Sequence, residues 1–326
     1  LLFDRRPTGI QAFSGHSAGE PLARLNSFEG FARSLIIGII PLLALEALGS
    51  KEMVTRAYLI ASILTLMITL NFASLERLLH RRWVLTLGVG FTVSATLILI
   101  FGNGMVIALA IGLQSAAASL FSICISLYIM DYIGKKDLIF TESKRLLYTG
   151  IAWMIGPTLG LWLWEEYFHW APFVLTACAS LSMLAYFWYL RLGHSLVIQP
   201  AKVPSANVFK IIPRYFEQPA LRIAYWITLS RSIFWMSVFI YGPIYVIEAD
   251  LPSWVAGGLL SLVSGLLLMS PLIRRLSIRF GTRLIIVYAF ILTGGSILML
   301  YFTGEPKPIG LLFWVTAAVG GATIDV

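Results

Sequence analysis

Long apolar stretches without any charged residue are the dominant pattern along this chain. Between Trp83 and Met130 there is no Asp, Glu, Lys or Arg. About 20 apolar residues suffice for a helix to cross the hydrocarbon core of a membrane, so this stretch is too long for one crossing. The sequence Gly102-Asn103-Gly104 within it is typical of a turn. The pattern therefore predicts two spanning helices joined by a tight turn.

Similar stretches recur through the rest of the chain. With the two helices of 83–130 they predict ten spanning helices, the others at 30–48, 57–75, 146–164, 170–190, 223–247, 251–273, 284–304 and 308–326. Strands of a membrane barrel would instead be about ten residues long with alternating polarity. A continuous apolar run such as 251–273 does not alternate. We therefore expect an all-α membrane protein.

The composition agrees with lipid as the solvent for much of the chain. Hydrophobic residues make up 58% of it and charged residues 12%, against about 25% charged residues in ordinary soluble domains. The net charge of +8 comes from basic clusters between the apolar stretches. Membrane orientation explains such clusters more simply than nucleic-acid binding. Cys124 and Cys178 fit no disulfide or metal spacing, and we expect no cofactor, metal or catalytic residue.

The basic residues are distributed unequally between alternate loops. Nineteen of the 24 lie in one set of segments, three in the other set, and two inside candidate helices. Because basic loops stay on the cytoplasmic side, the N-terminus is expected to be cytoplasmic. We expect a multi-pass protein of a bacterial inner membrane.

A polar connection with four prolines divides the chain. The expected organisation is a cytoplasmic N-terminal tail at 1–29, a six-helix half at 30–190, a cytoplasmic linker at 191–222 and a four-helix half at 223–326. The two halves match at an offset of 202 residues, which aligns Pro41 with Pro243. Such a match predicts an internal duplication with two pseudo-symmetric halves.

Charged residues take part in the same match. The offset of 202 carries Arg77 and Arg81 onto Arg279 and Arg283, and Arg33-Ser34 matches Arg231-Ser232 at an offset of 198. The difference of four residues is about one helical turn, so the face of the helix is nearly preserved.

Several motifs in this arrangement resemble the major facilitator superfamily. The segment from Ile278 to Arg283 is similar to the cytoplasmic Gly-x-x-x-Asp-Arg-x-Gly-Arg-Arg signature, although Ile278 replaces the Asp. Gly156-Pro157-Thr158-Leu159-Gly160 resembles the Gly-Pro-x-x-Gly motif of the superfamily's antiporters. The resemblance implies two six-helix halves and transport by alternating access. It also implies that the second half here lacks its last two helices, so that the chain is a fragment.

Arg33 and Arg231 are the first candidates for a substrate site. In the major facilitator superfamily, which this sequence resembles, the first helix of each half lines the central cavity. Organic-phosphate exchangers of that superfamily hold an anion with one Arg from each of these two helices. A guanidinium can bind phosphate or carboxylate through two hydrogen bonds. The alternative is a structural or interfacial arginine whose head reaches the membrane surface. If neither arginine reaches the surface, a ligand or solvent is the expected partner. Trp235 and Tyr241 can line the same cavity, or can serve helix packing.

A second set of residues is expected to act in gating. Gly156 and Gly160 lie on one helix face and allow another backbone to approach, while Pro157 favours a bend. The basic residues at the matched loops can latch the cytoplasmic side or only set the topology. They are Arg77, Arg81, Arg279 and Arg283.

The leading hypothesis is a secondary active transporter, or permease, for a small organic solute. An antiport mode and an anionic substrate are its finer expectations. No phosphate-binding loop is present, so an ion gradient or a counter-solute is expected to drive it. The alternatives are a transport-inactive receptor or assembly partner on the same fold, and a membrane-embedded enzyme. The last is disfavoured because the four His residues are scattered over loops.

Overall fold

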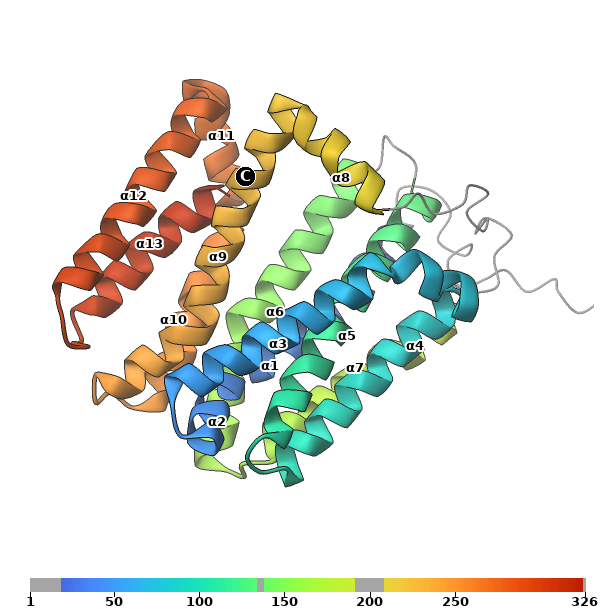
Figure 1. The fold of residues 1–326 in the computed structure, drawn as a ribbon, viewed down its shortest axis with the longest axis horizontal. Coiled ribbons are helices and arrows are strands. Elements are labelled where there is room, and N and C mark those ends of the chain that lie inside the picture. The colour runs from blue at the N-terminus through green and yellow to red at the C-terminus, as the bar shows by residue number, and fades with distance from the viewer. Residues whose placement is uncertain (1–18, 134–137, 191–207, 325–326) are drawn as a thin grey trace, which may run out of the picture. The chain divides into compact units, whose positions relative to one another are not determined.

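A computed structural model describes residues 19–133, 138–190 and 208–324 of the chain. The first part of it contains α1 (Gly19–Ile37), α2 (Ile39–Leu48), α3 (Lys51–Leu70), α4 (Phe72–Phe101), α5 (Val106–Tyr132), α6 (Leu138–Glu166) and α7 (Ala171–Tyr189). The second part contains α8 (Val208–Glu217), α9 (Pro219–Glu248), α10 (Ser253–Gly265), the short 3₁₀ helix η3 (Leu266–Met269), α11 (Ser270–Phe280), α12 (Thr282–Phe302) and α13 (Gly310–Ile324). Figure 1 shows these helices with their labels.

The expected fold class is confirmed for the described residues. Within the described ranges, eight helical segments are long and apolar enough to cross a membrane, with α1 and α2 counted as one. Ser253–Gly265 and Gly310–Ile324 are shorter apolar helices. Together they agree with the ten expected spans. The turn at 102–104 is also found, because α4 ends at Phe101 and α5 begins at Val106.

Several helix boundaries differ from the expected ones. The first helix begins at Gly19 rather than at residue 30, so the second part of the expected tail at 1–29 is helical, and its residues 1–18 lie outside the described residues. The basic segment after α3 is helical as well, because α4 continues through it with a single break at His80 (φ 58°, ψ 146°). The expected helix at 251–273 is interrupted by η3. Charged and polar residues do not end a helix when its backbone hydrogen bonds can continue. The helix ends that we expected at residues 30 and 75 from the positions of charged residues were therefore wrong.

The expected linker at 191–222 is only partly described. Residues 191–207 lie outside the described residues, and the remainder contains α8 and the first turn of α9.

Contacts divide the chain into two compact units. Unit 1 comprises the described residues of Leu1–Arg33, Leu43–Ala152 and His169–Ser205, and unit 2 those of Ser34–Leu42, Trp153–Phe168 and Ala206–Val326. This grouping differs from a division at 191–222, because the second parts of α1 and α6 belong with the later helices.

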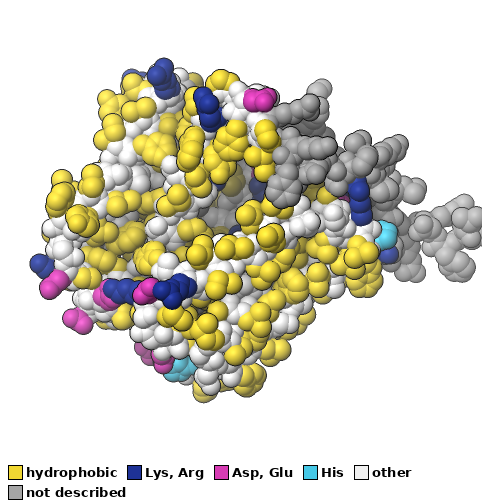
Figure 2. Space-filling model, viewed as in Figure 1, with side chains coloured by type: hydrophobic (Ala, Val, Ile, Leu, Met, Phe, Trp, Pro, Cys, Tyr) yellow, Lys and Arg dark blue, Asp and Glu magenta, His cyan; other side chains and the backbone are white. Residues whose placement is uncertain are grey.

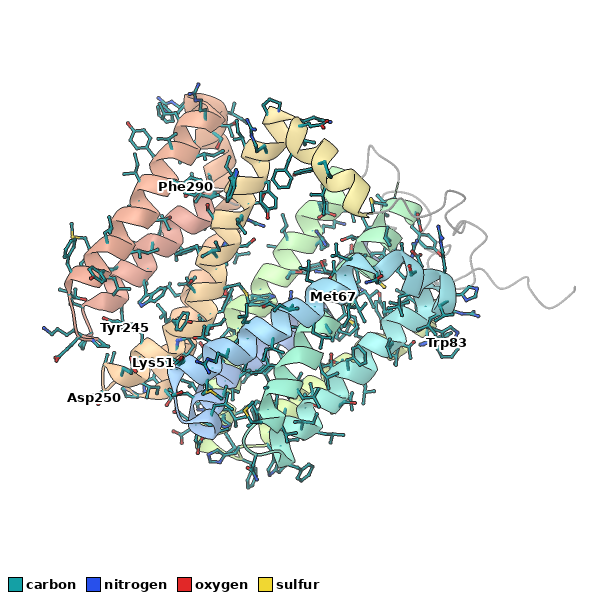
Figure 3. The ribbon with its side chains drawn as sticks, viewed as in Figure 1. Lys51, Met67, Trp83, Tyr245, Asp250 and Phe290 are labelled. Atoms are coloured by element: carbon teal, nitrogen blue, oxygen red, sulfur yellow. The ribbon has the colours of Figure 1, made fainter. Side chains whose placement is uncertain are left out.

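Unit 1 is built around α4 and α5. These helices pack against each other, α3 packs on α5, and α7 packs on α4. Gly88 of α4 makes room for the ring of Phe121 on α5, since a Cβ at this position would lie 2.7 Å from that ring. Figure 3 shows Lys51 and Trp83 at opposite ends of the α3–α4 pair.

Unit 2 contains two tightly packed helix pairs. α12 packs against α13, and α9 packs against α10. At the end of α9, the Tyr245 hydroxyl donates to the Lys307 carbonyl oxygen at 2.9 Å and accepts from the Lys307 N–H at 3.0 Å. Tyr245 therefore ties α9 to the segment that precedes α13.

The surface of the described residues is largely apolar. Figure 2 shows hydrophobic side chains over most of the face in view, with charged side chains gathered in a few places. Many large apolar residues are exposed, among them Ile60, Met67, Ile291 and Leu298. An apolar surface of this extent fits a lipid environment.

Candidate functional site

The first candidate residue, Arg33, lies beside a buried carboxylate on its own helix. Nε of Arg33 is 3.1 Å from Oε1 of Glu29, which is one helical turn earlier. A second contact, from Nη2 to Oε2, is long at 3.5 Å. The shorter contact is not aligned as a hydrogen bond, so this ion pair is held mainly by Coulomb attraction. The Glu29 side chain is 6% exposed and that of Arg33 is 34% exposed.

A small cavity, lined by apolar and polar side chains, adjoins this ion pair inside unit 1. It has a volume of about 10 Å³, close to the room that one water molecule needs. Its polar lining comes from four helices: Glu29 and Arg33 of α1, Thr92 of α4, Gln114 of α5 and Ser180 of α7. Among the described residues, Oε1 of Gln114 is buried and has no hydrogen-bond partner.

This pairing changes the interpretation of Arg33. We expected a ligand or solvent to offset its charge, and the structure supplies Glu29 instead. The sequence contained a signal for it, because Glu and Arg four residues apart on a helix face are neighbours. The structure adds that the pair is partly buried, with the carboxylate much deeper than the guanidinium.

Arg231 belongs to unit 2 and has a different environment. It is half-buried on α9, and the residue one turn before it is Ile227. Trp235 stacks on Phe239, with ring centroids 5.8 Å apart, and Phe239 in turn meets Trp153 of α6 at 5.2 Å. Tyr241 is half-buried on the same helix.

The glycines of α6 allow two backbones to touch within unit 2. A Cβ at Gly156 would collide with the side chain of Ser34, and one at Gly160 would collide with the carbonyl oxygen of Leu35. Both positions therefore require glycine at the crossing of α1 and α6. The expected close approach of another backbone at Gly156 and Gly160 is present.

The proline of α6 lies at a second close contact. The Thr158 N–H donates to Oγ of Ser261 on α10 at 3.2 Å, and the Thr158 hydroxyl donates to the same oxygen at 2.8 Å. On α10, a Cβ at Gly257 would be 3.0 Å from the carbonyl oxygen of Pro157. Sequence reasoning missed Ser261 and Gly257, because nothing local indicates which helix meets α6.

The basic residues near the break in α4 are of two kinds. Arg81 is 9% exposed and joins two helices: its Nε is 2.7 Å from Oε1 of Glu76 on α4, and it also pairs with Asp131 of α5. Its guanidinium lies 5.2 Å from the ring centroid of Tyr128, a favourable cation–π distance. Arg77 is exposed.

The matched residues of the second half differ. Arg279, in the last turn of α11, and Arg283, in the first turn of α12, are both exposed. Within the described ranges neither makes an ion pair, and Arg279 contacts only the ring of its neighbour Phe280, at 5.3 Å. The repeat thus preserves the sequence position but not the contact.

The described residues also lack any group of three or more His, Cys, Asp or Glu that could hold a metal ion. Long apolar helices, with a partly buried ion pair and a proline-containing helix that touches its neighbours backbone to backbone, are typical of a multi-pass membrane protein. The profile of the Major Facilitator Superfamily matches residues 25–324. The chain belongs to this superfamily, and it is accordingly a membrane transporter rather than an enzyme.

Comparison with solved structures agrees on the fold. A peptide transporter POT in complex with sulfate superimposes with a TM-score of 0.62 at 14% identity, covering 98% of this chain and 81% of that one. A bacterial homologue of the iron transporter ferroportin in its inward-facing state gives a TM-score of 0.61 at 19% identity, covering 94% and 80%. The same homologue in its outward-facing state gives 0.61 at 17% identity, covering 94% and 82%. A comparison with curated protein sequences finds no match.

Proposed function

We propose that this protein is a secondary active transporter that moves a small organic anion across the membrane by alternating access. The observation that carries the proposal is Arg33: a guanidinium on a spanning helix, next to a buried carboxylate, with a third of its side chain still exposed. A charge inside a membrane span is expensive and is found mostly where it faces a cavity or takes part in function.

The chemistry of arginine favours an anionic group on the solute. Its planar fork can hold a carboxylate or phosphate through two hydrogen bonds, which a lysine ammonium cannot reproduce. Arg231, at the matched position of the second half, adds a further positive charge. Trp235 and Tyr241 on the same helix offer apolar and polar surface to the organic part of the solute.

Alternating access needs contacts that close one side and can separate. The contacts of α6 with Ser34, Leu35 and Ser261 are suitable for this purpose, because they depend on small residues and hydroxyls rather than on interlocked bulky side chains. We assign Gly156, Pro157 and Gly160 to this gate. Arg77, Arg81, Arg279 and Arg283 are proposed to act at the opposite, cytoplasmic side.

Solute flux into proteoliposomes tests the substrate class. The probes are gluconate and glucose 6-phosphate as anions, tetraphenylphosphonium as an amphiphilic cation, and glucose as a neutral sugar. We expect flux of an anion only, and a loss of about tenfold in the Arg33→Lys and Arg231→Lys variants, because one charge-assisted hydrogen bond is worth about 1.5 kcal/mol.

Arg56→Lys is the matched control. Arg56 also follows a glutamate by four residues, and its Nη2 lies 2.6 Å from Glu52, but the pair is exposed. Unchanged anion flux in both Arg33→Lys and Arg231→Lys would remove these residues from the site. Absence of flux for every probe would favour the receptor or assembly function.

Exchange of two solutes is the second candidate for the mode of transport. The likeness of Gly156-Pro157-Thr158-Leu159-Gly160 to the antiporter motif favours it. An obligatory exchanger would take up labelled anion only into vesicles already loaded with unlabelled anion. Uptake into vesicles without internal anion would exclude this mode.

The basic-residue distribution supports a cytoplasmic N-terminus in a bacterial inner membrane. Single cysteines placed at Gly102 or Gly104 should react with an impermeant reagent from outside. Cys178 is exposed and Cys124 is buried, so both are replaced by Ala first. Labelling only after permeabilisation would reverse the proposed orientation.

A further inference from the structure

The helix α8 is too short to cross a membrane. Its ten residues extend about 15 Å, whereas the hydrocarbon core is about 30 Å thick. It directly precedes the spanning helix α9, and one residue, Gln218, separates the two. Gln218 is extended (φ −86°, ψ 115°) because Pro219 follows it and disfavours the helical conformation. The two helices therefore meet at an angle, as Figure 1 shows.

The sequence of α8 has an apolar side and a polar side. At about 100° per residue, the apolar residues at positions 208, 209, 212, 215 and 216 fall on one side of the helix, and the charged residues at positions 210, 214 and 217 fall on the other. A helix with this pattern lies in the plane of the membrane surface, with its apolar side in the boundary between headgroups and acyl chains.

The apolar side of α8 packs on α9 at one point and is open at another. The ring of Phe216 meets the ring of Tyr225 on α9 edge-on, with the centroids 5.1 Å apart. One turn before Phe216, the side chain of Ile212 is 44% exposed. The apolar side of α8 therefore extends beyond its contact with α9, and its open part is suited to a further apolar neighbour.

The first turns of α9 are exposed as well. Within 219–226 every residue except the half-buried Leu221 is exposed, and the side chain of Trp226 is 58% exposed. Because α9 is long and apolar enough to cross a membrane, these exposed residues fit contact with lipid. Trp and Tyr, as at 225 and 226, are enriched at the level of the headgroups. The junction of α8 with α9 thus fits the membrane surface.

The charge of this segment favours one kind of lipid. Residues 208–226 contain three basic residues, Lys210, Arg214 and Arg222, and one acidic residue, Glu217, which leaves two net positive charges. Arg222 is exposed, one turn after Gln218. Basic residues beside an apolar anchor attract the headgroups of anionic phospholipids.

We propose that α8 and the first two turns of α9 form a binding surface for anionic phospholipid. Acyl chains cover the apolar side at Ile212, and headgroup phosphates pair with the basic residues at 210, 214 and 222. The surface holds the start of α9 at a fixed depth in the membrane. This inference goes beyond the proposed function, since it concerns lipid and not the solute.

Spin labels measure the depth of α8. In a full-length protein whose Cys124 and Cys178 are replaced by Ala, a nitroxide is attached to Ile212→Cys on the apolar side or to Glu217→Cys on the polar side. The protein is reconstituted in vesicles of phosphatidylglycerol and phosphatidylcholine. We expect the label at 212 to collide mainly with oxygen, which concentrates in lipid, and the label at 217 to collide mainly with a water-soluble nickel complex.

Two exposed positions calibrate this measurement. Ile291→Cys on the spanning helix α12 serves as the lipid reference, and Glu305→Cys in the segment after α12 serves as the water reference. A label at 212 that behaves like the one at 305 would overturn the proposal. A label at 212 that neither reagent reaches would also overturn it, because protein rather than lipid would then cover α8.

Energy transfer measures the lipid preference. A dye on Ile212→Cys receives energy from phosphatidylglycerol or phosphatidylcholine that carries the same fluorophore on an acyl chain. We expect more transfer from phosphatidylglycerol, and a fall of this preference by up to about fivefold when Arg222→Gln removes one charge. The preference should disappear when Lys210→Gln and Arg214→Gln are added, and it should weaken in high salt.

Arg56→Gln is the matched control. Arg56 is also exposed, but it lies on α3 and its Nη2 is 2.6 Å from Oε1 of Glu52, so its removal should leave the preference at 212 unchanged. Equal transfer from the two lipids in the protein without charge changes would overturn the proposal, as would a preference that survives all three Gln substitutions. Neither measurement depends on solute flux, so the proposal stands or fails separately from the proposed function.

Discussion

The two units join their helices by different means. Unit 1 has a close glycine contact at Gly88 and adds charged and strongly polar side chains. Arg81 links α4 to α5 through Asp131, and Nδ2 of Asn26 donates to the Thr149 hydroxyl at 2.6 Å. Unit 2 uses glycines and hydroxyls, as at Gly160 against Leu35 and at Ser261 against Thr158.

This difference has a physical consequence. The attraction within an ion pair changes when a proton or another anion binds, because one of the two charges is then neutralised or replaced. A contact between backbones across a glycine depends on shape and responds to neither. The ion pairs described in unit 1 therefore respond to charge, whereas the glycine contacts described in unit 2 respond to shape.

Removing Arg81 should have the largest effect on stability. Arg81→Ala leaves Glu76 and Asp131 as neighbouring carboxylates without their cation. Because the guanidinium is nearly buried, we expect a loss of about 3 kcal/mol in the free energy of unfolding, measured by denaturation in mixed detergent micelles.

The repeat supplies the control for this change. Arg283→Ala removes the matched arginine of the second half, which is exposed and has no ion pair among the described residues, so its effect should stay within about 0.5 kcal/mol. Equal losses for the two variants would abolish the contrast between the units. Recovery of stability when Glu76→Gln and Asp131→Asn are added to Arg81→Ala would strengthen it.

A methyl group at Gly160 tests the backbone contact of unit 2. Gly160→Ala would push its Cβ into the Leu35 carbonyl oxygen, and overpacking of this kind costs about 1–3 kcal/mol. The unfolding free energy should fall by that amount, and solute flux should slow because the α1–α6 crossing cannot close.

Gly258→Ala is the matched control on α10. A Cβ at Gly258 meets nothing within 4 Å, so this variant should be neutral or gain up to about 1 kcal/mol from better helix propensity. A Gly160→Ala protein as stable as Gly258→Ala would show that α1 and α6 do not touch as described.

The smallest effect is expected at the hydroxyl contact. Ser261→Ala deprives the Thr158 N–H and hydroxyl of their acceptor on α10, and hydrogen bonds between membrane helices contribute about 0.6 kcal/mol on average. We expect a loss of about 1 kcal/mol for the two bonds, with faster solute flux if opening of this contact limits the cycle.

Ser237→Ala serves as the comparison for Ser261→Ala. The Ser237 hydroxyl donates to the Ile233 carbonyl oxygen of its own helix at 2.8 Å, so its removal breaks no link between helices. An effect as large as that of Ser261→Ala would mean that the loss reflects hydroxyl removal in general rather than the contact of α6 with α10.

The candidate site shows where sequence reasoning was sufficient and where it was not. Arg33 could be selected from sequence, because a charge in a spanning helix is rare and its partner must be accounted for. Its partner Glu29 was visible only as a residue four positions earlier. The structure shows that Glu29 is the more deeply buried of the two side chains. Thr92, Gln114 and Ser180, from three other helices, line the cavity beside the pair.

The repeat was informative about position and misleading about environment. It aligned Arg81 with Arg283 and Arg77 with Arg279. Arg81 has an interhelical ion pair, which Arg283 lacks among the described residues. The acidic partner Asp131 comes from α5, outside the matched motif. Whether the two halves superimpose by a twofold rotation stays a prediction.

The sequence by itself determined the class of this protein and the approximate places of its helices. This is a local property: in lipid the backbone must satisfy its own hydrogen bonds, so every crossing needs about 20 consecutive apolar residues that can be read directly. Only the tertiary structure decided that Gly160 meets Leu35, that Ser261 holds Thr158 and that Glu29 lies deeper than Arg33. These contacts join helix faces far apart in the chain, and in an apolar helix nearly every face looks alike, so the choice among them is made by packing.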